Sequence, residues 1–202
     1  LRCRFRAQKT DDSERHERFV YMGLYERERL EGLAATSGRI RQLAATSKHW
    51  VSAALIGIDD DNAVVIWEEL CGKSLRELLV TVDNETAIDL CARAIAELHD
   101  TDGTGLPSRD SASLQISEVG SYLLSTLPEC RDLITALAQR LLQSHVVEND
   151  DHRSVVHGDL HPGQLIIGEG QIGIIDFDRT HVGNPIEDIG NMRAQLWLGP
   201  PE

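Results

Sequence analysis

Residues 155–179, VVHGDLHPGQLIIGEGQIGIIDFDR, place a polar loop between apolar runs that are rich in Val and Ile. The runs SVV, LII and IGII predict short strands, because β-branched residues are enriched in strands. The loop carries two histidines, an acid and an amide, and another acid, Asp176, follows the last apolar run. Strands on both sides of a polar loop hold its side chains in fixed positions, as a catalytic centre requires. The segment is therefore a candidate active site.

Three side chains of this segment have the chemistry that phosphoryl transfer needs. Asp159 lies in the loop and can accept a proton from an attacking hydroxyl. Gln164 follows in the same loop with an amide oxygen that can bind a hard cation, and Asp176 offers a carboxylate to Mg²⁺. A base, an oxygen ligand and a carboxylate in this order match the phosphoryl-transfer pattern, in which the base precedes the metal ligands.

Composition restricts the partners of the chain. Of its 202 residues 41% are hydrophobic, which is enough for a packed core, and its formal net charge is −13. This charge argues against a nucleic-acid partner, since nucleic-acid binders show a basic face. No apolar run reaches membrane-spanning length and no signal peptide is visible. The four cysteines form no CxxC pair, which favours a reduced, cytoplasmic compartment over a zinc or redox motif.

The order of predicted elements indicates an α+β fold. We expect a strand over residues 1–9, a long helix over 12–46 with a break near 36–38, and a hairpin of strands over 52–59 and 62–70. The composition changes near residue 71, where a mainly helical region begins. The chain starts inside a strand-like run at Leu1 and ends soon after a helical pattern, which is typical of a fragment.

Three ordered motifs, HGDLHPGQ, IIDFDR and GNPIEDIGN, resemble those of the aminoglycoside phosphotransferase family, which shares the protein-kinase-like fold with choline kinases. The resemblance covers residues 155–195 closely and the run VVIWEELCGKSLRELL more weakly. It implies a two-lobe fold, with residues 1–70 as a partial, truncated β-rich N-lobe that ends in a hinge. Residues 71–202 would form the helical C-lobe with the catalytic loop and the metal-binding strand.

The resemblance also implies roles for individual residues. Asp159 would be the catalytic base, and Asp176 would be the principal Mg²⁺ ligand. Gln164 would be a second metal ligand at a position where most members have Asn, and the pattern HGDxHxGQ marks a subfamily that includes maltokinase-like members. His157 and Asp188 would support the catalytic loop structurally.

A nucleotide site is implied as well. Backbone groups of the hinge would bind the adenine, and the hinge candidates are Glu68, Glu69 and Leu70. The family uses a strand lysine paired with a helix glutamate to hold the phosphates. Lys9 is the candidate lysine and Glu26 its candidate partner, with Glu28 and Glu31 as competing partners. The strands and the phosphate-covering loop that should precede this lysine are absent from the sequence.

The implied activity is transfer of phosphate from ATP or GTP, with Mg²⁺, to a hydroxyl of a small molecule such as an aminoglycoside, a sugar or an amino alcohol. Two alternatives stay open. A non-catalytic kinase-fold protein would explain the missing phosphate loop and Gln164. A metal-dependent hydrolase would use His157, Asp159, His161 and Asp176 as a metal site.

Overall fold

A computed structural model describes residues 2–7, 16–80, 84–108, 112–144, 153–168 and 170–198. The chain divides into two compact units, Leu1–Pro107 with Ser154–Glu202, and Ser108–Arg153. Among the described residues, the sheets belong to the larger unit, and the smaller unit is helical. This division leaves the lobe boundary predicted at residue 70 untested, so that boundary stays a prediction.

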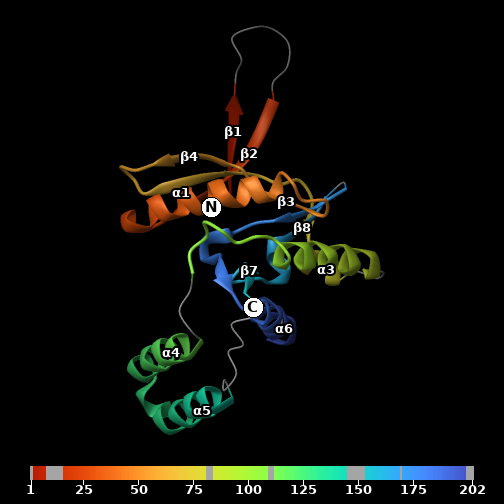
Figure 1. The fold of residues 1–202 in the computed structure, drawn as a ribbon. Coiled ribbons are helices and arrows are strands. Elements are labelled where there is room, and N and C mark those ends of the chain that lie inside the picture. The colour runs from red at the N-terminus through yellow and green to blue at the C-terminus, as the bar shows by residue number, and fades with distance from the viewer. Residues whose placement is uncertain are drawn as a thin grey trace. The chain divides into compact units, whose positions relative to one another are not determined.

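The first sheet of the larger unit is antiparallel, with the strand order β1-β2-β5-β4 (Figure 1). Its strands are β1 (Arg2–Ala7), β2 (His16–Leu24), β4 (Leu55–Asp59) and β5 (Val64–Glu68). Helix α1 (Arg27–Ala44) packs Leu30 and Leu33 against Val65 of this sheet. The predicted hairpin is confirmed, because β4 and β5 are adjacent antiparallel strands.

The prediction of one helix over residues 12–46 is wrong in its first half. Residues His16–Leu24 form β2, which pairs with β1 on one side and β5 on the other. Two ladders of backbone hydrogen bonds outweigh the helix propensity of the Glu- and Arg-rich flanks.

The break predicted near residues 36–38 is also wrong. Helix α1 continues through this segment, where the Ser37 hydroxyl donates to the Leu33 carbonyl at 2.6 Å. Leu33 and Ile40, on either side of the segment, are both buried. Packing of this apolar face outweighs the weak helix propensity of the sequence TSG.

The second sheet has the order β3-β9-β8-β6, and a separate strand pair lies beside it. The strands are β3 (Trp50–Ser52), β6 (Lys73–Ser74), β8 (Leu165–Ile167) and β9 (Ile172–Ile174), with β7 (Ser154–Val156) and β10 (His181–Gly183) as the pair. The helices of this region are α2 (Leu75–Leu79), α3 (Glu85–His99) and α6 (Ile186–Leu198). The strands predicted around the candidate site are thus confirmed as β7, β8 and β9.

The main core lies between this second sheet and the helices around it. Its fully buried members include Trp50, Leu98, Val155, Leu165 and Ile174. These residues come from β3, α3, β7, β8 and β9, so the strands that flank the candidate site are themselves anchored in the core. Burial of large aliphatic side chains makes such strands a rigid support for the loop between them.

The smaller unit is a helical hairpin of α4 (Ala112–Thr126) and α5 (Arg131–Ser144), joined by the 3₁₀ turn η1 (Pro128–Cys130). Pro128 begins the turn between the two helices, since Pro fits the first turn of a helical segment but not its interior. In the described parts of the chain, no helix is both long and apolar enough to cross a membrane.

Glu97 of α3 ties this helix to the turn that precedes β3. Its carboxylate accepts hydrogen bonds from the Ser47 hydroxyl at 2.7 Å, from the backbone N–H groups of Lys48 and His49 at 2.9 and 2.8 Å, and from His49 Nδ1 at 3.1 Å. Partial burial by itself raises its pKa, but these donors prevail and lower the pKa of Glu97 to about 2.

We expect Glu97→Gln to lower the free energy of unfolding by about 1–3 kcal/mol at neutral pH, since two backbone donors lose a charged acceptor. The folded-state pKa lies below the ordinary value of 4.5, so the stabilisation is complete above that pH and is lost as the pH falls towards 2. Urea unfolding at pH 7 and pH 3 measures this, with exposed Glu118→Gln as the control. An equal loss of unfolding free energy at both pH values would show that the ionised Glu97 carboxylate is not the source of the stabilisation.

Candidate active site

The turn after β7 presents Asp159. Gly158 has a φ of +81°, and a Cβ at this position would lie 2.4 Å from the Arg179 carbonyl oxygen, so only Gly fits. Asp159 follows the turn, and its Oδ1 accepts a hydrogen bond from Asn191 Nδ2 of α6 at 3.2 Å. Sequence reasoning missed Asn191. Asn191 lies three residues after Asp188, so both side chains lie on one face of α6. This spacing is the sequence signal that could have identified Asn191.

Asp188 fixes the backbone of this loop from α6. It is fully buried and accepts hydrogen bonds from the N–H groups of His157 and Gly158 at 2.8 and 2.9 Å, and from His99 Nε2 at 2.9 Å. Burial by itself raises its pKa, but these three donors prevail and hold the pKa of Asp188 below its ordinary value. The arrangement suits the supporting role predicted for Asp188. His99 was not predicted.

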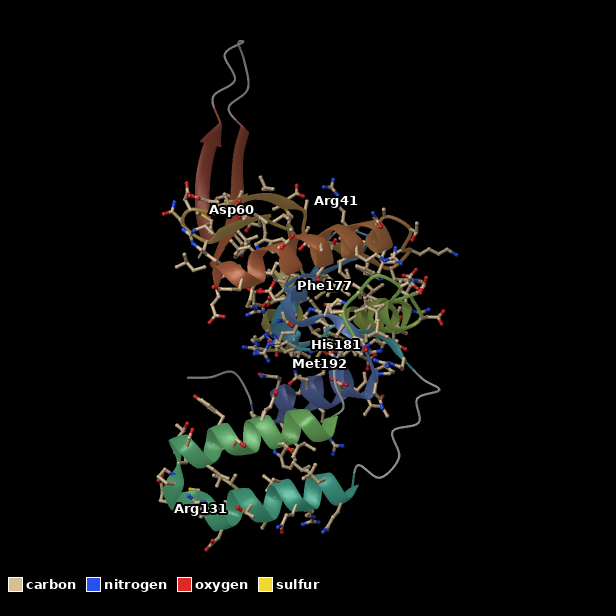
Figure 2. All side chains as sticks on the ribbon, turned by 60° about the vertical axis from the view of Figure 1, so that its left-hand side comes forward. Arg41, Asp60, Arg131, Phe177, His181 and Met192 are labelled. Carbon is tan, nitrogen blue, oxygen red and sulfur yellow. The ribbon has the colours of Figure 1, made fainter. Side chains whose placement is uncertain are left out.

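His157 links the loop to the end of β9. Its side chain is fully buried, its Nε2 lies 2.9 Å from the Ile175 carbonyl oxygen, and its ring centroid lies 5.0 Å from that of Phe177. Phe177 is packed among the side chains next to helix α1 (Figure 2). Burial lowers the pKa of His157 and keeps the ring neutral, so Nε2 carries the hydrogen that it donates to Ile175. This environment suits the predicted structural support.

The β8–β9 hairpin brings Gln164 and Asp176 together. Leu165 pairs with Ile174, and the Ile175 N–H donates to the Gln164 carbonyl at 3.1 Å. As a result Gln164 Nε2 lies 3.3 Å from Asp176 Oδ2, while Gln164 Oε1 accepts from the His161 N–H at 3.3 Å. Asp176 itself has a left-handed backbone, with φ 68° and ψ 55°, a strained state that is concentrated at functional sites.

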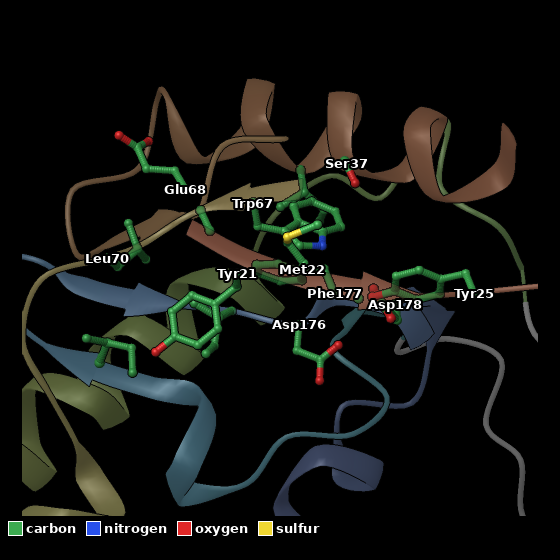
Figure 3. A pocket seen from close by; sticks show the side chains of 15 residues that line it. Tyr21, Met22, Tyr25, Ser37, Trp67, Glu68, Leu70, Asp176, Phe177 and Asp178 are labelled. Carbon is green, nitrogen blue, oxygen red and sulfur yellow. The ribbon is translucent and has the colours of Figure 1, made fainter. Parts of the chain in front are cut away.

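A pocket of about 270 Å³ lies between the first sheet, helix α1 and the β8–β9 hairpin (Figure 3). Glu68 and Leu70, two of the three hinge candidates, line one part of it, whereas Glu69 is not a lining residue. Asp176 and Asp178 line another part. The pocket therefore joins the predicted hinge to the predicted metal ligand.

Comparison with known families supports this geometry. The sequence profile of the phosphotransferase enzyme family (APH) matches residues 24–200, which is most of the chain. The chain belongs to this family. The predicted family is therefore confirmed, while the HGDxHxGQ subfamily stays a prediction. A search of curated proteins finds no significant match.

Solved structures of phosphotransferases share the fold. Aminoglycoside phosphotransferase APH(3'')-Id from Streptomyces rimosus aligns with a TM-score of 0.62 at 16% identity, covering 88% of this chain and 70% of that chain. Macrolide 2'-phosphotransferase MphH from Brachybacterium faecium aligns with a TM-score of 0.57 at 18% identity, covering 93% of this chain and 69% of that chain. A choline/ethanolamine kinase family protein from Mesorhizobium loti aligns with a TM-score of 0.59 at 15% identity, covering 91% of this chain and 61% of that chain. The predicted kinase-like α+β fold is confirmed.

The residues of this APH chain fit a hard cation. Asp176 is an exposed carboxylate, and burial together with the negative charge of Asp176 raises the pKa of the nearby Asp178. A cation would relieve this repulsion. Mg²⁺ is commonly held by one or two carboxylates together with phosphate oxygens. Gln164 presents its amide nitrogen to Asp176, so its oxygen could join the ligands only after the amide turns.

The hydrolase-type metal site is not formed. Within the described ranges, no group of three or more His, Cys, Asp and Glu side chains is placed to hold a metal. His157 Nε2 is occupied by the Ile175 carbonyl, and His161 Nδ1 accepts the Gly163 N–H at 3.0 Å. Local hydrogen bonds thus direct both histidines to the backbone.

The Lys9–Glu26 pair stays a prediction, because Lys9 lies outside the described residues. Glu26 immediately precedes α1, and its side chain is exposed and makes no capping hydrogen bond. The competing partners Glu28 and Glu31 are exposed on α1.

Proposed function

We propose that the chain transfers the terminal phosphate of ATP or GTP to a hydroxyl of a small molecule. The observation that carries this proposal is the pocket that joins the hinge residues Glu68 and Leu70 to Asp176. The loop that carries Asp159 also reaches Asp176, because Gln164 Nε2 lies 3.3 Å from Asp176 Oδ2. Phosphoryl transfer is mainly positioning and charge neutralisation, which this arrangement can supply.

In this reaction the nucleotide base would lie near Glu68 and Leu70, against the apolar side chains of Ile166 and Ile175. Backbone groups of the hinge, including those of Glu69, would bind its polar edge. The phosphates would extend towards Asp176. This orientation places the terminal phosphate near the catalytic loop.

Asp159 would orient the acceptor hydroxyl and take its proton, while Asn191 holds the carboxylate in position. Asp176, with Gln164 after its amide turns, would hold Mg²⁺, which neutralises phosphate charge when bound. His157 and Asp188 would keep the loop backbone fixed. The proton-transfer role rests on Asp159 alone among these residues, since the others face backbone groups or the cation.

The acceptor class is proposed from the similar structures. They include a complex of a phosphotransferase with streptomycin and ATP, a macrolide phosphotransferase and a choline/ethanolamine kinase family protein. An aminoglycoside, a sugar or an amino alcohol is therefore the acceptor that we propose. The net charge of −13 favours the cationic members of this set. We further propose a cytoplasmic location and no nucleic-acid partner.

The first test is calorimetric binding of ATP and GTP, with Mg²⁺ and with a chelator, because it needs no knowledge of the acceptor. We expect Mg²⁺-dependent binding, and about 10–100-fold weaker binding by Asp176→Ala, as for loss of a metal-site residue. Asp60→Ala, at an exposed turn, is the matched control. Nucleotide binding that requires neither Mg²⁺ nor the Asp176 side chain would refute the proposed site. A panel of hydroxylated acceptors, read by ADP release, then tests turnover.

A non-catalytic nucleotide-binding protein is the second candidate. The charged residues among the pocket lining are the acids Glu68, Asp176 and Asp178, and no Lys or Arg of the described chain lines it. A triphosphate would then depend on cations for charge neutralisation. This candidate predicts nucleotide binding without turnover of any acceptor in the panel.

A further inference from the structure

Arg76 lies next to the catalytic loop without a partner of opposite charge. It belongs to α2, which packs against the 3₁₀ turn η3 (Pro162–Gln164) of that loop. Its side chain is partly buried. In the described parts of the chain it makes no ion pair and no side-chain hydrogen bond. Since a guanidinium carries five N–H donors, a partly buried one without protein acceptors is suited to bind an anion.

His161 provides a second donor beside Arg76. Its Nδ1 accepts the Gly163 N–H at 3.0 Å, so this nitrogen has a lone pair and the hydrogen of the neutral ring is on Nε2. A Cβ on Gly163 would lie 2.9 Å from His161 Cε1 and 3.7 Å from Arg76 Cζ. The imidazole and the guanidinium therefore border the bare backbone of the same glycine, close enough to contact one small ligand.

The two donors lie on the same face of the loop as Asp159. Burial alternates along the loop, with buried Leu160, Pro162 and Gln164 between partly exposed Asp159, His161 and Gly163. The backbone of His161 is extended, with φ −149° and ψ 165°, a conformation in which side chains two residues apart point to the same side. Because the Cβ direction of Gly163 faces Arg76, the guanidinium lies on this open face too.

We propose that Arg76 and His161 form a subsite for an anionic oxygen group, a phosphate or a carboxylate, on the open face of the catalytic loop. Both offer hydrogens to a ligand, so a cationic part of the acceptor would lie elsewhere. The acids Glu68, Asp176 and Asp178 line the pocket, and Arg76 supplies a positive charge that its described lining lacks. This inference rests on the proposed function, in which the bound group is the terminal phosphate of the nucleotide or an anionic substituent of the acceptor.

The first test titrates inorganic phosphate into the chain, with a chelator present, and follows the backbone amide of Gly163 by NMR. We expect saturable binding by the unchanged chain and about 10–100-fold weaker binding by Arg76→Gln, the scale of hydrogen bonds to a charged group. His161→Asn keeps an acceptor for the Gly163 N–H and should weaken binding by about 2–10-fold. Arg41→Gln removes an exposed guanidinium from α1 (Figure 2) and should leave binding unchanged.

Two further measurements identify the source of the anionic group. If it is the terminal phosphate, Arg76→Gln should weaken binding of ATP with Mg²⁺ by about 10–100-fold and leave the affinity for ADP unchanged. If it belongs to the acceptor, both nucleotide affinities should stay the same. The KM should then rise only for acceptors of the panel that carry a phosphate or a carboxylate.

The outcomes separate this inference from the proposed function. Phosphate binding that is absent, or that is equal in Arg76→Gln and the unchanged chain, would overturn the inference alone. Unchanged nucleotide affinities together with an unchanged KM for every acceptor would overturn it as well. Phosphate binding that needs Arg76, in a chain that binds no ATP, would support the subsite and overturn the proposed function. Should Arg76→Gln not fold by circular dichroism, Arg76→Met, which keeps an apolar stem, replaces it with the same expected loss.

Discussion

Replacing Asp159 with Asn should lower kcat for phosphoryl transfer by about 10²–10⁴-fold, the usual contribution of a general base. In the proposed reaction the Asp159 carboxylate accepts the proton of the hydroxyl, and an amide is far too weak a base to do so. Asn is a suitable replacement because its oxygen can still accept the hydrogen bond that Asn191 donates at 3.2 Å. The rate is measured as ADP release with the best acceptor of the panel.

Two further measurements make this prediction specific. Asp159 does not line the pocket, so the affinity of the Asp159→Asn variant for ATP should match that of the unchanged chain. Asp60→Asn, which alters an exposed carboxylate in the turn between β4 and β5 (Figure 2), should keep the full rate. An Asp159→Asn variant with an unchanged kcat would show that this carboxylate is not the base.

Sequence reasoning located the site residues whose contacts lie close together along the chain. Asp159, Gln164 and Asp176 lie in one loop and one hairpin, and the alternating pairing of β8 with β9 places Gln164 beside Asp176. A hairpin register follows from local pattern, because a slip of one residue would expose the buried face. The chemistry of these residues was therefore readable from their order.

Contacts between distant segments could not be read in the same way. His99 contacts Asp188 across 89 positions of sequence, and His49 contacts Glu97 across 48. No local pattern encodes such encounters. The same reason explains the error at β2, whose strand conformation depends on pairing with β1 and β5 rather than on its own composition.

Asp188→Asn should lower the free energy of unfolding by about 3–5 kcal/mol, the usual cost of removing one partner from a buried charged network. Asp188 is fully buried and is the acceptor for His99 and for the N–H groups of His157 and Gly158. An amide has one acceptor oxygen and adds two donors, so at least one of these groups would lose its partner. The free energy of unfolding of a typical domain is only about 5–15 kcal/mol in total. Urea unfolding, followed by circular dichroism, measures the loss.

The dependence of this loss on pH identifies the carboxylate as its source. The folded-state pKa of Asp188 lies below the ordinary value of 3.8, so its ionised form stabilises the fold fully above that value. This stabilisation disappears as the pH falls further, and the difference between variant and unchanged chain should shrink with it. Asp89→Asn breaks an exposed 2.8 Å pair with Arg93 and should change stability far less. A loss at Asp188 as small as that of this control would mean that the catalytic loop is held by other contacts.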